Sequence, residues 1–126
     1  MLRRFGNREE SGAAAAELSL ILPALMLILL GTEEFGRLLW TKSLLDHAVN
    51  EAARCGSVNA TTCGSSDAIA TYAVQRSRPL SLSTSVFTAT SPSCGSQVAA
   101  SYPFTFVVPS LLPFNITLSA RACFPK

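Results

Sequence analysis

Four cysteines carry most of the chemical capacity of this 126-residue chain, which has a single histidine and eight acidic side chains. Cys55, Cys63, Cys94 and Cys123 show no Cys-x2-Cys spacing, which argues against a zinc site or a redox dithiol. Their even number in a small domain is typical of disulfides formed in an oxidising compartment. Of the three possible connectivities we favour Cys55–Cys63, which is close in sequence, and Cys94–Cys123, which would tie a turn to the last predicted strand.

The other polar side chains form no catalytic pattern. His47 follows Asp46 on a predicted helix and is interpreted as a residue of its polar face. The sequence contains no Gly-rich phosphate loop, metal triad or nucleophile motif. A net charge of +2, scattered along the chain, is not typical of a nucleic-acid-binding protein. We therefore expect no enzyme, no cofactor or metal, no small-molecule substrate and no nucleic-acid partner.

Glu17 is a carboxylate inside a long apolar run. Ala13 to Gly31 comprise 19 residues with one charge, Glu17, and one hydroxyl, Ser19. A helix of this length is about 28 Å long, close to the roughly 30 Å hydrocarbon thickness of a bilayer. Pro23 is better tolerated in a membrane helix than in a soluble one. We predict a transmembrane helix, in which Glu17 either has a function or reaches the headgroups from near the helix end.

The flanking sequence predicts the orientation of this helix. Arg3, Arg4 and Arg8 precede it, and the positive-inside rule places them in the cytoplasm. A cleaved secretory signal is disfavoured, because the run is longer than the usual apolar core and no small-x-small site follows it. The cysteines beyond the helix favour an oxidising side for the rest of the chain. We expect a cytoplasmic leader at 1–12, a transmembrane helix at 13–32 and an extracytoplasmic domain at 33–126.

The helix is predicted to continue to residue 54 with an apolar stripe that faces the outer domain. Residues at three- and four-residue spacing form this stripe: Phe35, Leu38, Leu39, Leu45, Val49, Ala52 and Ala53. Trp40 and Phe35 are either interfacial anchors or packed on the domain. Gly56 is predicted to be the left-handed C-cap. A second helix is predicted at 66–77, with Ser66 as N-cap and Pro79 as its stop.

Period-two patterns at 80–86, 98–108 and 116–122 predict three strands in an antiparallel meander, covered on one face by the helix. Pro103 predicts a bulge or an edge position in the middle run. The fold class is therefore α+β. Residues 55–126 contain five charged side chains but 21 serines and threonines, which favours packing against other subunits or an extracellular setting.

A basic leader, a glycine, an apolar helix and a glutamate five residues after the glycine together resemble the class III signal of type IV prepilins and pseudopilins. More narrowly, GAAAAELSLILPALMLILLGTEEFGRLLW resembles the TadE-like family of Tad/Flp pilus assembly. The shared features are an alanine-rich start, a glutamate, a proline in a leucine-rich run, and a Glu-Phe-Gly-Arg segment. Here these are Ala13–Ala16, Glu17, Pro23, and Glu34, Phe35, Gly36 and Arg37. SLLDHAVNEAARCG continues the resemblance, and YPFTFVVP and NITLSARACFP continue it more loosely.

The resemblance implies a pilin-like fold and a minor-pilin or pseudopilin role in the bacterial inner membrane. A prepilin peptidase would cut between Gly12 and Ala13, and Glu17 would neutralise the new N-terminal amine of a neighbouring subunit, since paired buried charges cost less than isolated ones. The implied partners are the lipid bilayer, the peptidase, other pilin subunits and the inner-membrane assembly platform. The alternatives are an uncleaved membrane scaffold that keeps residues 1–12, and a membrane-tethered module that binds an extracellular ligand.

Overall fold

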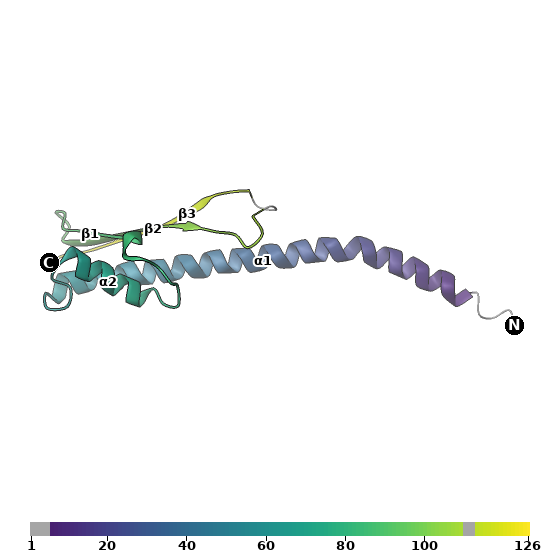
Figure 1. Ribbon diagram of the computed structural model, residues 1–126, viewed down its shortest axis with the longest axis horizontal. Coiled ribbons are helices and arrows are strands. Elements are labelled where there is room, and N and C mark those ends of the chain that lie inside the picture. Colours follow the sequence, from purple (N-terminus) through teal and green to yellow (C-terminus); the bar gives the residue numbers. More distant parts are fainter. Residues whose placement is uncertain (1–5, 110–112) are drawn as a thin grey trace. The chain divides into compact units, whose positions relative to one another are not determined.

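The computed structural model describes residues 6–109 and 113–126 (Figure 1). Its elements in chain order are α1 (Gly6–Val58), α2 (Ser66–Arg76), the 3-10 helix η1 (Thr84–Val86), β1 (Phe87–Thr90), β2 (Ser96–Phe104) and β3 (Ile116–Phe124). The chain divides into two compact units, Met1–Gly36 and Arg37–Lys126, and α1 runs through the boundary between them. The predicted α+β class, a long N-terminal helix followed by a three-stranded antiparallel sheet, is confirmed.

In the first unit, α1 begins at Gly6 rather than at the predicted Ala13 and continues through Pro23. Alanine and leucine dominate this stretch, and both are strong helix formers. The hydroxyls of Ser19 and Thr32 donate to the backbone carbonyl oxygens of Ala16 and Leu29, at 2.7 and 2.8 Å. The helix therefore satisfies these polar groups internally, as an apolar surrounding requires.

In the second unit, the buried face of α1 is made by Leu45, Ala48, Val49 and Ala52, which are fully buried. The predicted stripe is correct for its C-terminal half and wrong for Leu39, whose side chain is 52% exposed. The reason is geometric, because Leu39 lies two residues before the buried Thr41 and therefore about 200° round the helix from it. Phe35, on the first unit, is likewise exposed.

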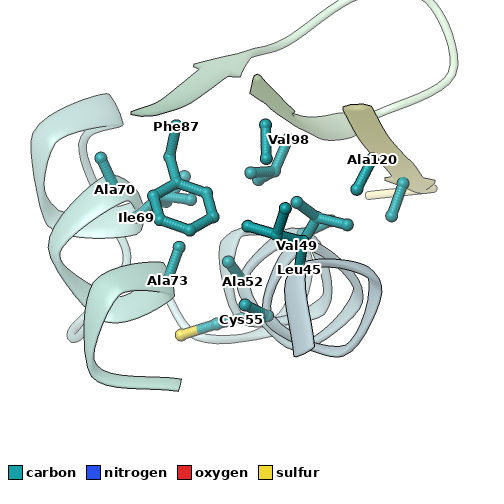
Figure 2. Packing of buried hydrophobic residues seen from close by; sticks show 14 of the residues in the cluster. Leu45, Val49, Ala52, Cys55, Ile69, Ala70, Ala73, Phe87, Val98 and Ala120 are labelled. Atoms are coloured by element: carbon teal, nitrogen blue, oxygen red, sulfur yellow. The ribbon is translucent and has the colours of Figure 1, made fainter. Parts of the chain in front are cut away.

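The sheet has the order β1-β2-β3, with both pairs antiparallel, and α1 and α2 lie along one face of it (Figure 2). Figure 2 shows Phe87 of β1 pointing toward Ile69 and Ala73 of α2, while Val98 of β2 faces Val49 of α1. All of these side chains belong to one buried cluster. The small alanines in this cluster allow close approach of helix and sheet.

Three predicted strand boundaries change in the structure. The predicted strand at 80–86 is wrong, because this stretch forms turns and η1, and β1 begins only at Phe87. Its backbone bonds are local, such as Leu80 N to Ser77 O and Val86 N to Ser83 O, and no ladder partner is used. The hydroxyls of Ser83 and Ser85 contact each other within this stretch. The other two strands are 96–104 rather than 98–108, and 116–124 rather than 116–122.

Two predicted helix ends are also wrong. Gly56 is not a C-cap, because α1 continues to Val58. A Cβ at position 56 would contact Ser96 Oγ and come within 2.8 Å of Ile69 Cδ1, so glycine permits close packing here. The N-cap of α2 is Ser65 rather than Ser66, and its hydroxyl accepts a hydrogen bond from Ala68 N at 3.2 Å. The helix ends at Arg76, one residue earlier than predicted.

Pro103 lies where β2 has a neighbour on only one side. The β2–β3 register runs unbroken through the pair Pro103–Thr117, so there is no bulge. β1 pairs only with residues 97–100 of β2, and at Pro103 the strand is therefore a local edge. The missing N–H of proline is tolerated in such a position, although β2 as a whole is the central strand of the sheet rather than an edge strand.

Candidate functional site

The most distinctive surface is the apolar part of α1 in the first unit. Among the described residues, α1 is one helix long and apolar enough to cross a membrane, and none of its most apolar 18-residue window is buried. The large side chains between 18 and 30 are 40–79% exposed. A soluble core helix would bury such side chains, whereas lipid or other apolar helices would cover them. The helix is therefore a candidate single-pass membrane anchor.

Glu17 is exposed on this helix, among apolar neighbours. One turn before it lies Ala13, and one turn after it lie Leu20 and Ile21. Within the described part of the chain, no ion pair of the Glu17 carboxylate is found. A carboxylate at this place needs a partner from outside the chain or access to the headgroup layer. The alanines before it leave room for another helix to approach.

The predicted cleavage bond between Gly12 and Ala13 lies inside α1. No heavy atom lies within 4 Å of a Cβ built on Gly12. Cleavage of this bond would require a local unwinding of the helix, because the bond lies within α1. Glycine lowers the cost of that unwinding by about 1 kcal/mol relative to alanine.

The Glu-Phe-Gly-Arg segment places its four residues in different surroundings. Glu34 is buried, with 6% of its surface exposed, whereas Phe35 is 63% exposed and Gly36 faces open space. The Arg37 guanidinium lies over the ring of Phe104, with Cζ 5.3 Å from the ring centroid. This cation–π contact attaches the end of β2 to α1. Phe104 in turn packs edge-to-face on Phe106, with centroids 5.3 Å apart.

Within the second unit, α1 and β2 run antiparallel and match in length. Arg37 meets Phe104 at one end, and Gly56 meets Ser96 at the other. From Arg37 to Gly56 the helix advances 19 residue steps and rises about 28 Å, and from Ser96 to Phe104 β2 advances eight steps and rises about 26 Å. We call the end of the second unit where Arg37 contacts Phe104 the Arg37 end, and the end where Gly56 lies against Ser96 the Gly56 end. The Arg37 end follows the apolar helix in the chain.

Both disulfides lie at the Gly56 end. The structure pairs Cys55 with Cys63 and Cys94 with Cys123, the connectivity preferred from the sequence, with Cα–Cα distances of 5.8 and 6.4 Å. The first joins the last turn of α1 to the loop before α2, and the second joins the β1–β2 turn to β3. Gly95 in that turn has a φ of +121°, a conformation that favours glycine.

The remaining predicted site residues are not brought together. His47 is exposed, in line with its interpretation as a polar-face residue. In residues 6–109 and 113–126, no three or more His, Cys, Asp or Glu side chains lie close enough to hold a metal ion. The described hollows are open, such as one of about 450 Å³ between α2 and β1, which Asp67 lines together with hydroxyl side chains.

Two further exposed apolar features lie in the second unit, and the second of them was not predicted as a site. Trp40 is 50% exposed, so half of its surface is covered and half is open, and neither alternative for it is excluded. Val107 and Phe114, in the connection between β2 and β3, are 68% and 63% exposed. The available signal was the charge-free segment TFVVPSLLPFN, at 105–115, which the sequence analysis treated only as strand and turn.

The comparison with known proteins bears on the first 54 residues. A family model described as TadE-like protein matches residues 12–54. This segment is similar to TadE-like proteins. The match includes Glu17, Pro23 and the Glu-Phe-Gly-Arg segment, so the predicted resemblance is confirmed there. No curated protein and no solved structure matches the chain.

The TadE-like segment covers about a third of the chain and ends one residue before Cys55. It comprises the exposed apolar helix and the part of α1 that buries Leu45, Val49 and Ala52 in the second unit. The sheet lies outside the match.

Proposed function

We propose that this chain is a minor-pilin-like, or pseudopilin, component needed to assemble a Tad/Flp-type adhesive pilus. It acts through packing of its membrane helix and docking of its outer unit on other subunits. The observation that supports this most is an exposed apolar helix that carries the carboxylate of Glu17 within a TadE-like segment. Such a helix has two suitable surroundings, lipid and the apolar helices of other subunits.

Processing and assembly are linked through the first turns of this helix. A prepilin peptidase cuts after Gly12 on the cytoplasmic side and leaves a free amine on Ala13. The Glu17 carboxylate neutralises the amine of a neighbouring subunit, which lowers the cost of holding both charges at membrane depth. The alanines at 13–16 permit the close helix approach that this pairing requires.

The proposed location is the bacterial inner membrane, with the N-terminus in the cytoplasm and the second unit on the periplasmic or extracellular side. Arg3, Arg4 and Arg8 support this orientation through the positive-inside rule. Two disulfides in the second unit support an oxidising side for it. The assembly platform of the inner membrane is the proposed site of subunit docking.

Substitution of Glu17 tests the proposal in cells that carry the full chain. We expect Glu17→Ala and Glu17→Gln to abolish surface pili, because the neighbour's amine loses its partner, while the amount of protein in the membrane fraction stays unchanged. Pili are measured by shearing them from the surface and quantifying the major subunit.

Glu33→Gln is the matched control, since Glu33 is an exposed carboxylate on the same helix just beyond the apolar run. It should leave piliation intact. Normal piliation in the Glu17→Ala strain would show that the carboxylate has no part in assembly, and would favour a membrane-tethered binding module instead.

A further inference from the structure

We propose that the bond between Cys94 and Cys123 is a site of thiol–disulfide exchange with an external dithiol, and that the other disulfide stays closed under the same conditions. The partner is a protein dithiol of the disulfide-oxidoreductase class. The sulfur that it attacks is Cys94 Sγ. The exchange takes place within the second unit and is independent of the role proposed for Glu17.

The two disulfides differ in their exposure to solvent. Cys55 and Cys63 belong to the buried cluster, with 8% and 3% of their surface exposed, and Figure 2 shows Cys55 among these side chains. Cys94 is exposed in the β1–β2 turn, and Cys123 is half-buried near the end of β3. Exchange requires that an external thiolate reaches a disulfide sulfur. Cys94, the most exposed of the four cysteines, is therefore the accessible target.

The exposed disulfide lies on the face of the sheet that is turned away from the buried cluster. Residues of β3 alternate between the two faces, and Ala122 is one of its buried residues. Arg121 and Cys123 therefore share the opposite face. Gln97 of β2 is the register partner of Cys123 and lies beside it on this face.

Two cationic side chains lie near this bond. The Arg121 guanidinium donates a hydrogen bond to Gln97 Oε1 at 2.9 Å, and the same oxygen lies 3.9 Å from Cys94 Sγ. Lys126 Nζ donates to Ser91 Oγ, in the β1–β2 turn, at 3.3 Å. From residue 68 to 126 the sequence has four Lys or Arg side chains and no Asp or Glu. Cations attract an incoming thiolate and stabilise the thiolate that leaves, so both effects favour exchange here.

The exposed bond can open without unfolding of the sheet. The β2–β3 ladder extends beyond Cys123 to the pair of Ser96 and Phe124, so it holds Cys123 in place after the bond breaks. Only the turn at 91–95 is released. At the other disulfide, Asn59 N donates to the carbonyl oxygen of Cys55 at 2.9 Å, and both sulfurs lie in buried residues. A thiolate reaches that bond only after the end of α1 opens.

One dithiol balances the reaction. Its thiolate forms a bond to Cys94 Sγ, the bond between the two cysteines breaks, and Cys123 leaves as a thiolate that takes a proton from water. The partner's second thiolate then attacks the partner's own sulfur in the mixed disulfide and releases Cys94. The partner is oxidised by two electrons to a disulfide and gives up two protons to water, and both cysteines end as thiols.

Timed alkylation of the full chain tests the order of reactivity. The protein is held in detergent with dithiothreitol as the dithiol, samples are alkylated with iodoacetamide at intervals, and mass spectrometry identifies the modified cysteines. We expect Cys94 and Cys123 to be modified at least about tenfold faster than the other two, because a protected bond reacts only from a locally open state. Near-UV circular dichroism checks that the chain stays folded. Equal rates at all four cysteines, or faster modification of Cys55 and Cys63, overturn the proposal.

A trapping experiment identifies the attacked sulfur and the class of partner. A thioredoxin whose second active-site cysteine is replaced by serine cannot complete the exchange and remains bound as a mixed disulfide. We expect this thioredoxin to be linked to Cys94. Linkage to Cys123 overturns the assignment of the attacked sulfur, and the absence of any linked product overturns the assignment to a protein dithiol.

Substitution of Arg121 tests the contribution of its charge. We expect Arg121→Gln to slow reduction by dithiothreitol about twofold to fivefold at low ionic strength, where charges at a protein surface are least screened. Arg78→Gln is the matched control, since Arg78 is an exposed cation outside the sheet and its loss changes the net charge equally. Equal rates in the two variants overturn the role of Arg121.

Discussion

Gly56 and Gly36 belong to the same helix but lie in opposite surroundings. A Cβ at Gly56 would contact Ser96 Oγ and Ile69 Cδ1, whereas nothing lies within 4 Å of one at Gly36. At the residue scale, the absence of a side chain therefore permits close packing at Gly56, whereas a side chain at Gly36 would contact no neighbouring atom. Gly56 sets how near β2 approaches the helix at the end of the second unit that bears the disulfides.

Substitution of these two glycines by alanine is expected to affect the Tm differently. Gly56→Ala gains roughly 1 kcal/mol of helix propensity but overpacks the core at a cost of about 1–3 kcal/mol, so we expect a net loss near 1 kcal/mol. For a unit of this size the Tm falls by about 4–8 °C, measured by near-UV circular dichroism in detergent. Gly36→Ala should not lower it.

A second substitution tests whether the contact with Ser96 causes the loss of stability in Gly56→Ala. Ser96→Gly removes the side chain that the new methyl group would meet, so Gly56→Ala should cost less in that background than alone. An unchanged or higher Tm for Gly56→Ala in the natural background would show that the contact with Ser96 is relieved without cost.

At the scale of elements, the second unit is held differently at its two ends. The Gly56 end has both disulfides, and the Arg37 end has the contact between Arg37 and Phe104. The chain-entropy model assigns about 2.6 kcal/mol to the Cys55–Cys63 loop and about 3.6 kcal/mol to the longer Cys94–Cys123 loop. A domain of 90 residues has a total stability of only about 5–13 kcal/mol.

Loss of the disulfides should therefore remove a large part of this stability. We expect the paired change Cys94→Ala with Cys123→Ala to lower the free energy of unfolding by about 3–4 kcal/mol. The measurement is chemical denaturation of the full chain in detergent, with and without reductant. A variant that lacks all four cysteines should not respond to reductant. An identical transition for the oxidised and reduced natural chain would contradict a stabilising role.

At the scale of the whole molecule, the question is whether the protein in the membrane keeps or lacks residues 1–12. The proposed processing removes residues 1–12 and exposes the amine of Ala13, whereas a permanent scaffold keeps the leader. We expect a chain that begins at Ala13, measured by intact mass and N-terminal sequencing of unreduced protein from native membranes. A strain without prepilin peptidase is the control and should yield the longer chain. A chain from the natural strain that still starts at Met1 would favour the uncleaved scaffold.

The sequence alone was sufficient to predict the candidate membrane anchor and the α+β architecture. An apolar run of bilayer length needs no tertiary partner to be recognised, and Glu17 stands out within it because of its type. Local patterns also predicted α2, two of the three strands and the disulfide between Cys55 and Cys63, which are eight residues apart. The other preferred pair, Cys94 and Cys123, is 29 residues apart and was chosen because it would tie a turn to the last strand. The TadE-like resemblance rests on the same segment, where residue types at fixed spacing carry the signal.

Tertiary structure decided where the elements end and which surfaces remain uncovered. The alternation at 80–86 resembles a strand, yet the chain forms a ladder only from Phe87, whose side chain enters the core against α2. Gly56 resembles a helix stop, yet contact with β2 keeps the helix intact through it. Likewise, the contact between Arg37 and Phe104 joins two residues that lie 67 positions apart in the sequence. The hydrophobic periodicity of the sequence indicates which residues prefer to be buried. It does not indicate which neighbour buries them, because that neighbour comes from a distant part of the chain.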